Sequence, residues 1–365
     1  MLKAATILGT RPEIIKMSPL LPKFDREFSH ILIHTNQHYS ENMDKVFFNE
    51  LSLSKPNYNL NAGSGTHAEQ TAKMMIGLET VLLKEKPDFV VVNGDTNTTM
   101  AGALTSAKLN IPLVHVEAGC RSFNRSMPEE INRIIADHCS NLLAASDRIS
   151  YGNLIREGIK KKSIFVSGST AIEATLRNRA FSRKSNILEE LELGEKYYIL
   201  CTLHRAENTN NIGVLKGIIG ALNNISSRIQ LVFPIHPRTI KIIKQNKIKI
   251  SPKIKVIEPR GYIDFLKLMD NALLIMSDSG GIQEEAAALN TPCLILRKET
   301  EWTYLTEAGK NILLGTNPKT IIEKTSQLIN NRKQIHNMEK IKIITDDDAS
   351  GKIINELKEF AKRLK

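Results

Sequence analysis

Three charged residues follow predicted strands in the N-terminal half of the chain: Arg11, Asp95 and Glu117. Each comes after a short apolar or β-branched segment. Because ligands bind at the carboxyl ends of strands in open α/β sheets, we expect these side chains to share one sheet edge, with the carboxylates placed for proton transfer. Each also has a structural interpretation. Asp95 can be a turn or cap residue, and Glu117 can form an ion pair with Arg121.

The exit from the first predicted strand also has the features of an anion site. Thr10 and Glu13 have the spacing of a capping box, and Arg11 and Lys16 place cations beside it. Basic side chains in a first helical turn oppose the helix dipole, so we expect them to serve a ligand such as phosphate. A solvated surface pair is the alternative.

Glu129 has two competing interpretations. With Ser126 it has the spacing of a second capping box around Pro128, which would explain the carboxylate without chemistry. It can also act as a third acid beside Asp95 and Glu117. Glutamine caps a helix as well as glutamate does, so loss of activity in a folded Glu129→Gln variant would favour catalysis.

A glycine-rich stretch in the C-terminal half predicts a phosphate site. Residues 278–286 read Asp-Ser-Gly-Gly-Ile-Gln-Glu-Glu-Ala and follow an apolar segment, the order of a strand, a tight turn and a helix. Ser279, Gly280 and Gly281 would leave backbone N–H groups unpaired at the helix N-terminus, where phosphate binds. Glu285, one turn further on, is placed to accept hydrogen bonds from a ribose. The alternative is an ordinary turn with acidic residues near a helix N-terminus.

Two histidines and one aromatic residue complete the candidates from the residues alone. His204, followed by Arg205, and His236 both come after predicted strands in the C-terminal half. Both can face a ligand, although a lone histidine is more often structural. Phe265 lies in the amphipathic helical segment 262–269, where its ring can stack on a base or pack in the core.

Strand-like and helix-like segments alternate along both halves, which predicts α/β domains with parallel sheets. A chain of 365 residues exceeds the size at which a single core keeps growing, so two domains are expected. We predict an N-terminal domain over 1–169, a C-terminal domain over 170–349 and a final helix, 350–365, long enough to pack back onto the first domain.

The formal charge of +11 suits an anionic partner. The basic residues are dispersed over solvent-facing helices without interleaved aromatics, so we predict no nucleic-acid partner beyond weak, non-specific retention. The sequence has no apolar run of membrane-spanning length and no signal peptide, so we expect a cytoplasmic protein. The four scattered cysteines lack the spacing of a disulfide framework, zinc site or redox pair.

Together these motifs resemble those of the non-hydrolysing UDP-N-acetylglucosamine 2-epimerase family along nearly the whole chain. The matching motifs occur in family order: Gly9-Thr-Arg-Pro-Glu13, Gly94-Asp-Thr96, His115-Val-Glu-Ala-Gly119, Pro128-Glu-Glu130, His204-Arg205 and Asp278-Ser-Gly-Gly-Ile-Gln-Glu-Glu285. The resemblance implies an α/β, GT-B-like architecture. Two Rossmann-like, doubly wound parallel-sheet domains would face each other across a central cleft, commonly in a homodimer.

The resemblance also implies roles for individual residues. Asp95, Glu117 and Glu129 match the carboxylates assigned to chemistry in the family, in the N-terminal domain, and we add His204 to the catalytic set. The nucleotide, UDP, would be held mainly by the C-terminal domain, through His204, Phe265, Ser279, Gly280, Gly281 and Glu285, with Arg11 and Lys16 added from the N-terminal domain. The family needs neither metal nor nicotinamide, so we expect no cofactor.

The implied reaction interconverts UDP-GlcNAc and UDP-ManNAc. The hydrogen on C2 is not next to a carbonyl, so direct abstraction would leave an unstabilised carbanion. Elimination of UDP, with a carboxylate taking the C2 proton, gives a 2-acetamidoglucal instead. Re-addition of UDP with a proton from the other face inverts C2. A closed site must keep both intermediates from escaping.

One departure from the family pattern concerns the sugar. The family usually reads Thr-Glu-Arg-Pro-Glu where this chain has Thr300-Glu-Trp-Thr-Tyr304, so Trp302 replaces an arginine that contacts the nucleotide-sugar. We include Trp302, Arg205 and His236 as further residues of the cleft, and Arg260 as a cation that would compensate for the arginine. A related sugar such as UDP-2,3-diacetamido-glucuronic acid is therefore an alternative substrate.

Other activities also stay open at this point. A hydrolysing epimerase would release free N-acetylmannosamine and UDP. A catalytically inactive protein would only bind the UDP-sugar, and a GT-B glycosyltransferase would require an acceptor and would not invert C2.

Overall fold

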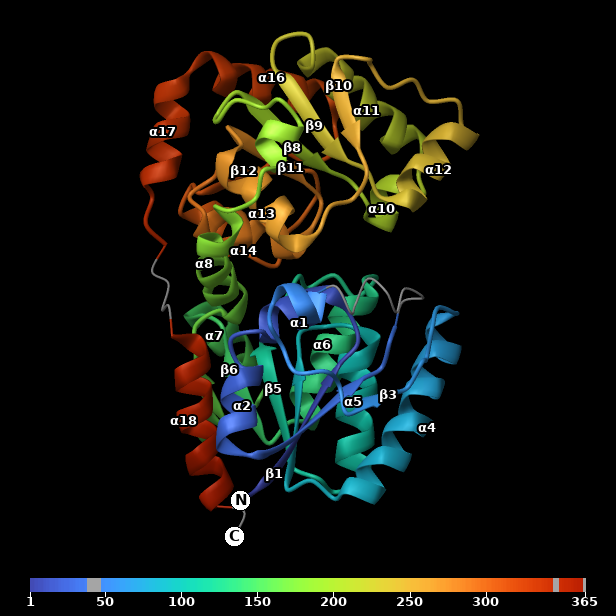
Figure 1. The fold of residues 1–365 in the computed structure, drawn as a ribbon, viewed down its shortest axis with the longest axis vertical. Coiled ribbons are helices and arrows are strands. Elements are labelled where there is room, and N and C mark those ends of the chain that lie inside the picture. The colour runs from blue at the N-terminus through green and yellow to red at the C-terminus, as the bar shows by residue number, and fades with distance from the viewer. Residues whose placement is uncertain (38–46, 344–347, 364–365) are drawn as a thin grey trace. The chain divides into compact units, whose positions relative to one another are not determined.

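The computed structural model describes residues 1–37, 47–343 and 348–363. The chain divides into two compact units (Figure 1). Unit 1 consists of Met1–Ala174 with the segment from residue 345 onward, and unit 2 consists of Thr175–Ile344. Helix α8 (Thr170–Ser182) contains the division between them. The boundary predicted after residue 169 falls at the N-terminus of this helix.

Unit 1 is built on one parallel sheet with the strand order β3-β2-β1-β4-β5-β6-β7. The central strand β4 is buried at all five positions, as in a strand covered on both faces. The strands are β1 (Lys3–Leu8), β2 (Ser29–His34), β3 (Tyr58–Asn59), β4 (Phe89–Asn93), β5 (Leu113–Ala118), β6 (Leu142–Ala145) and β7 (Ile164–Val166).

Helices cover this sheet, and α4, α5 and α6 pack side by side over one face (Figure 1). The core beneath them includes Ile7, Val90 and Val92 from the strands, with Met74 and Leu78 from α4. The helices of unit 1 besides α8 are α1 (Arg11–Met17), α2 (Leu21–Glu27), α4 (His67–Glu85), α5 (Asn97–Lys108), α6 (Pro128–Cys139), α7 (Arg148–Arg156), the 3₁₀ turn η1 (Lys161–Ser163) and α18 (Ala349–Lys362).

Unit 2 repeats this architecture with a parallel sheet of order β10-β9-β8-β11-β12-β13. Its strands are β8 (Tyr198–Thr202), β9 (Gln230–Pro234), β10 (Ile254–Ile257), β11 (Leu274–Ser277), β12 (Cys293–Ile295) and β13 (Asn311–Leu313). Its helices are α9 (Ile187–Glu190), α10 (Ala206–Thr209), α11 (Ile212–Ile225), α12 (Pro237–Gln245), α13 (Tyr262–Asn271), α14 (Gly280–Ala288), α15 (Thr303–Glu307), α16 (Pro318–Asn330) and α17 (Arg332–Lys340). The predicted class of doubly wound, Rossmann-like parallel sheets is confirmed for both units.

Both sheets have a point at which the strand order reverses. In unit 1 it lies between β1 and β4, and in unit 2 between β8 and β11. Open α/β sheets bind ligands outside the carboxyl ends of the strands at such switch points. The loops that follow these four strands therefore carry the positions at which functional side chains are expected.

The C-terminal helix α18 belongs to unit 1. The backbone N–H and the hydroxyl of Ser350 both donate to Glu173, at 2.7 and 2.5 Å. Lys358 pairs with Glu27 of α2 at 2.6 Å, and the apolar side chains of Ile353 and Leu357 are buried. The helix predicted over 350–365 thus forms over Ala349–Lys362, and residues 364 and 365 lie outside the described part of the chain.

The described residues form neither a membrane-spanning helix nor a cluster of metal ligands. None of their helices combines the length and apolar character needed to cross a bilayer. They also contain no group of three or more His, Cys, Asp and Glu side chains that could hold a metal ion.

Candidate active site

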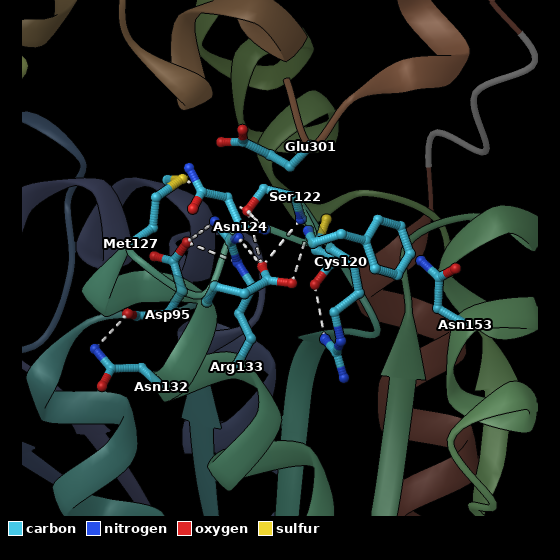
Figure 2. Close-up of polar contacts among 12 residues, drawn as sticks. Asp95, Cys120, Ser122, Asn124, Met127, Asn132, Arg133, Asn153 and Glu301 are labelled. Carbon is cyan, nitrogen blue, oxygen red and sulfur yellow. Dashed lines mark hydrogen bonds and ion pairs between the residues drawn. The ribbon is translucent and has the colours of Figure 1, made fainter. Parts of the chain in front are cut away.

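Strands β4 and β5 bring Asp95 and Glu117 to neighbouring strand ends. The two strands pair in parallel with Asn93 opposite Val116, so both carboxylates lie at the same edge of the sheet. The Asp95 side chain is 27% exposed, whereas Glu117 is buried. Figure 2 shows Asp95 beside Asn132 and Arg133, above the ends of the strands. The edge that ligands reach in such folds is therefore acidic at two adjacent positions.

The backbone of Glu117 is strained. Its φ of +69° lies in the left-handed region, and the pairing of β5 with β6 shifts register between Val116 and Ala118. A residue with a Cβ atom adopts this conformation at a cost of about 1–2 kcal/mol. Such strain is concentrated at functional sites, because it aims a side chain where a regular strand would not.

Helix α1 supplies two cations. Lys16 Nζ lies 2.6 Å from Glu117 Oε1, and the guanidinium of Arg11 lies over the ring of Phe47, 5.6 Å from its centroid. The ion pair predicted as a structural alternative, between Glu117 and Arg121, is wrong. Arg121 instead reaches other carboxylates deeper in the unit.

Arg133 of α6 holds Asp95 with two nitrogen atoms. Its Nε and Nη2 lie 3.1 and 2.5 Å from Asp95 Oδ2, and its Nη1 donates to Glu130 at 2.8 Å (Figure 2). Glu130 in turn accepts the backbone N–H groups of Ser122 and Phe123, both at 2.9 Å. Asp95 is therefore an ion-pair partner, not a helix cap. Arg133 was not among the predicted site residues. Its spacing from Glu130 places both on one face of α6, whereas its contact with Asp95 depends on the fold.

Glu129 is half-buried at the second position of α6, and the predicted capping box around it is wrong. Met127 is the N-cap residue of α6, and the hydroxyl of Ser126 donates to Asn124 at 2.7 Å instead. Pro128 occupies the first helical position, which its fixed φ favours. The helix thus begins one residue later than the box requires, and the capping explanation for Glu129 falls away.

The other predicted capping box, of Thr10 and Glu13, is confirmed. The buried Glu13 accepts hydrogen bonds from the backbone N–H groups of Gly9 and Thr10 and from the Thr10 hydroxyl, at 2.8–2.9 Å. It also accepts from the hydroxyls of Thr96 and Thr99, at 2.7 and 3.2 Å. Burial raises the pKa of Glu13, and these donors oppose the rise. Glu13 thereby joins the loop after β1 to the loop after β4.

In unit 2, Asp278 is the corresponding buried carboxylate. It accepts the backbone N–H groups of His204 and Arg205, at 3.1 and 2.9 Å, and the side-chain amide of Asn208 at 3.1 Å. The ring nitrogen Nδ1 of His204 lies 3.3 Å from Asp278, and the ring stays 42% exposed. Partial loss of hydration lowers the pKa of His204, while Asp278 opposes this change. Asp278 thus fixes the loop after β8.

Two arginines and one glutamate surround the N-terminus of α14. The space that a Cβ atom on Gly281 would occupy is open, with no atom within 4 Å. A Cβ atom on Gly280 would lie 2.3 Å from Glu301 Oε1 and 3.7 Å from the guanidinium of Arg205. The fully buried Arg297 donates to Glu301 at 2.8 Å. Backbone donors and cations therefore meet at this helix end, as in an anion site, and neither Arg297 nor Glu301 had been singled out from the sequence.

The remaining nucleotide-site candidates lie on α13 and α14. Ser279 is the N-cap residue of α14, and Glu285 lies half-buried on the same helix. Burial and the carboxylate of Glu285 raise the pKa of Tyr262, the first residue of α13. Phe265 is half-buried on α13, so its ring combines core contact with an accessible part.

Three other predicted residues have identifiable surroundings. His236 is exposed and caps α12 by accepting the N–H of Arg238 at 3.2 Å. Arg260 pairs with Glu190 of α9 at 2.6 Å. Trp302 is buried, and among the described residues its indole N–H has no hydrogen-bond partner. His236 and Arg260 thus have structural partners, and their roles toward a ligand stay predictions.

Rossmann-like sheets with such loops at their switch points are typical of proteins that bind nucleotides. Comparison with known protein families, sequences and structures identifies the family of this chain. Residues 23–358 match the family model described as UDP-N-acetylglucosamine 2-epimerase. The chain belongs to the UDP-N-acetylglucosamine 2-epimerase family, which confirms the resemblance found in the motifs.

Named relatives cover nearly the whole chain. The UDP-N-acetylglucosamine 2-epimerase of Methanococcus maripaludis is 47% identical over 97% of both chains. That of Methanocaldococcus jannaschii is 50% identical over 92% of this chain and 94% of the relative. The crystal structure of the M. jannaschii enzyme with UDP-GlcNAc and UDP matches 98% of this chain and 100% of that chain, with a TM-score of 0.88 and 47% identity. The fold is therefore GT-B-like.

A relative with a different sugar in its name is also similar. The UDP-2,3-diacetamido-2,3-dideoxy-D-glucuronate 2-epimerase of Pseudomonas aeruginosa is 39% identical over 88% of this chain and 91% of the relative. Relatives of both names are epimerases, which are isomerases.

Proposed function

We propose that this protein is a non-hydrolysing UDP-N-acetylglucosamine 2-epimerase that interconverts UDP-GlcNAc and UDP-ManNAc. The observation that carries the proposal is the 47–50% identity, over more than nine-tenths of the chain, to relatives with this name. Two contacts support it. Glu117 faces Lys16, and Asp95 faces Arg133, so that each acid has a cation beside it.

In the proposed reaction, UDP leaves C1 of the sugar with the electrons of the C1–O bond. A carboxylate removes the C2 proton, and the electrons of the C2–H bond form the C1–C2 double bond of 2-acetamidoglucal. UDP then adds back to C1, and a proton delivered to the opposite face of C2 inverts that centre. We assign these proton transfers to Asp95, Glu117 and Glu129, and we assign His204 to the departing diphosphate.

We propose that unit 2 holds most of the nucleotide, through the residues predicted from the sequence. The open position at Gly281 and the guanidinium of Arg205 near Gly280 support a diphosphate at the N-terminus of α14. Glu285 would then take the ribose and Phe265 the uracil ring, and Arg11 and Lys16 stay predicted ligands of the nucleotide. We further propose a cytoplasmic homodimer, as the family resemblance implies. The proposed reaction includes no cofactor.

Proton NMR of UDP-GlcNAc with the purified protein in deuterated water tests the proposal. The expected result is a mixture that contains UDP-ManNAc, with deuterium at C2 of the sugar. Free N-acetylmannosamine would instead indicate a hydrolysing enzyme. An unchanged spectrum would contradict turnover of this substrate.

The related UDP-2,3-diacetamido-glucuronate is a second candidate substrate. The 39% identity to the P. aeruginosa enzyme favours it, and so does Trp302, which stands where the family pattern has an arginine and whose buried N–H finds no partner in the described part of the chain. Competition between the two UDP-sugars in one reaction gives the ratio of their kcat/KM values directly. If kcat/KM is higher for the uronate than for UDP-GlcNAc, the uronate becomes the proposed substrate.

A further inference from the structure

His115 lies fully buried in β5, with an acceptor at each ring nitrogen. Its Nε2 is 2.8 Å from the carbonyl oxygen of Gly94, and its Nδ1 is 2.6 Å from Asp137 Oδ1. A carbonyl oxygen can only accept, so Nε2 must carry a proton. The state of Nδ1 depends on whether Asp137 is ionised.

The surroundings of Asp137 keep it ionised. Burial alone would raise the pKa of Asp137, but the net change is a decrease, to which the charge and the hydrogen bond of Arg121 contribute. Its second oxygen, Oδ2, accepts the N–H of Gly119 at 3.1 Å and Nη2 of Arg121 at 2.6 Å. An ionised carboxylate has no proton to donate, so Nδ1 of His115 carries a proton as well. His115 is then an imidazolium inside the unit.

The charges around His115 balance one another, and the partly exposed Glu157 among them also lies 3.7 Å from Nε2 of His138. Asp137 stands between His115 and Arg121, and Arg121 also donates to Glu157 at 2.8 and 2.7 Å. Two cations therefore face two carboxylates. These groups come from β5, the loop after it, α6 and the C-terminal end of α7, while the loop after β4 contributes the carbonyl oxygen of Gly94. A charge change at one position therefore affects the others.

This network holds the backbone on both sides of the proposed catalytic carboxylates. Gly94, which His115 binds, directly precedes Asp95. Gly119, which Asp137 binds, lies two residues beyond Glu117 and has a φ of +80°. A Cβ atom at Gly119 would lie 2.3 Å from the carbonyl oxygen of Ser150, so this segment cannot shift toward α7.

We infer that Asp137 is a positioning residue which, through a doubly protonated His115, fixes the strand ends that carry Asp95 and Glu117. The inference rests on the proposed function, because that function assigns proton transfer to Asp95 and Glu117. It concerns neither contact with the substrate nor nucleotide binding.

The Asp137→Asn variant separates charge from shape. Its amide oxygen can still accept from Gly119 and Arg121, while its NH2 group donates to Nδ1 of His115. His115 then keeps its bond to Gly94 but loses its charge. We expect kcat to fall by a factor on the order of 10², with the Kd for UDP unchanged within about twofold. Asp147→Asn is the matched control, because Asp147 caps α7 and asparagine caps equally well, so its kcat should not change.

Imidazole ¹H–¹⁵N correlation spectra of the labelled protein test the protonation of His115 without any turnover. We expect both ring nitrogens of His115 to carry protons in the natural protein, and only Nε2 to do so in Asp137→Asn. A neutral His115 in the natural protein would overturn the inference. An unchanged kcat in the variant would overturn it too, as would an equal loss of kcat and UDP affinity. If no UDP-sugar is turned over, the proposed function fails, and these spectra still decide the state of His115.

Discussion

The buried carboxylates of unit 1 differ in the groups that surround them. Glu13 accepts hydrogen bonds from five neutral donors on two loops. Glu117 faces an ammonium group at 2.6 Å, from a strained backbone position. A carboxylate whose oxygens are taken up by backbone and hydroxyl donors supports the fold. One that faces a cation at the ligand edge of a sheet is available for proton transfer.

Glu129 provides the first test of a catalytic role for a carboxylate in unit 1. No capping role in α6 explains its carboxylate, so replacing it with glutamine removes charge without removing a helix cap. We expect Glu129→Gln to lower kcat by about 10²–10⁴-fold, the contribution of general acid–base catalysis. Its thermal unfolding should match that of the natural protein. A folded variant with full activity would remove Glu129 from the catalytic set.

Glu13→Gln should have the opposite outcome. Both oxygens of Glu13 accept hydrogen bonds, so an amide placed there turns its NH2 group toward donors whichever way it lies. We expect the free energy of unfolding to fall by about 1–3 kcal/mol, measured by urea denaturation. Glu69→Gln is the control, because only Oε2 of Glu69 is used in the exposed capping box of α4. An equal effect of the two substitutions would show that amide orientation does not decide the loss.

At the scale of elements, the apolar runs predicted most of the parallel strands, because strands buried on both faces leave continuous β-branched sequences. The two-residue strand β3 (Tyr58–Asn59) was missed, since it lies in a turn-rich stretch and its pairing depends on β2. The position of Pro128 also decided where α6 begins, against the capping spacing. The partners of Asp95 and His115 were not predictable, because Arg133 and Asp137 come from a helix that only the folded sheet brings near.

Lys310 shows how one buried side chain can end a helix. Its ammonium group donates to the carbonyl oxygens of Glu339 and Ile341, at the C-terminal end of α17, and to the side chain of Asn290, at 2.8–3.1 Å. Burial lowers the pKa of Lys310 from 10.5 to about 8, and Lys196 adds to this effect while Glu339 opposes it. A cation is favourable at a helix C-terminus, so the site balances that attraction against lost hydration.

The pH dependence of stability follows from this pKa. Between about pH 8 and 10.5 the unfolded chain keeps a proton on Lys310 that the native protein has lost. The free energy of unfolding therefore rises with pH in this range, by at most about 1.4 kcal/mol per pH unit. The Lys310→Met variant lacks this contribution. The free energy of unfolding of the natural protein minus that of the variant should therefore increase from pH 8 to 10.5 in urea titrations. A constant difference would show that Lys310 titrates at its ordinary pKa.

At the scale of the whole molecule, both units have a buried carboxyl group that accepts backbone N–H groups at the switch point. In unit 1 Glu13 accepts the backbone N–H groups of Gly9 and Thr10, after β1. In unit 2 Asp278 accepts those of His204 and Arg205, after β8. A buried carboxyl group therefore fixes each loop from within. The loops fixed in this way carry Arg11 and Arg205, the cations proposed to meet an anionic ligand.

We propose that unit 1 carries out the proton transfers and unit 2 binds the nucleotide. Substitutions in each unit test this assignment. Asp95→Asn removes a proposed acid from unit 1, so kcat should fall by about 10²–10⁴-fold while the Kd for UDP stays within about twofold. Glu285→Ala removes the proposed ribose acceptor from unit 2. A hydrogen bond to a charged group contributes about 1.5–3 kcal/mol, so the Kd for UDP should rise by about 10- to 100-fold. Calorimetric titration with UDP and the NMR assay give both quantities for each variant. Equal losses of UDP affinity in the two variants would contradict the assignment, because chemistry and nucleotide binding would then depend on the same residues.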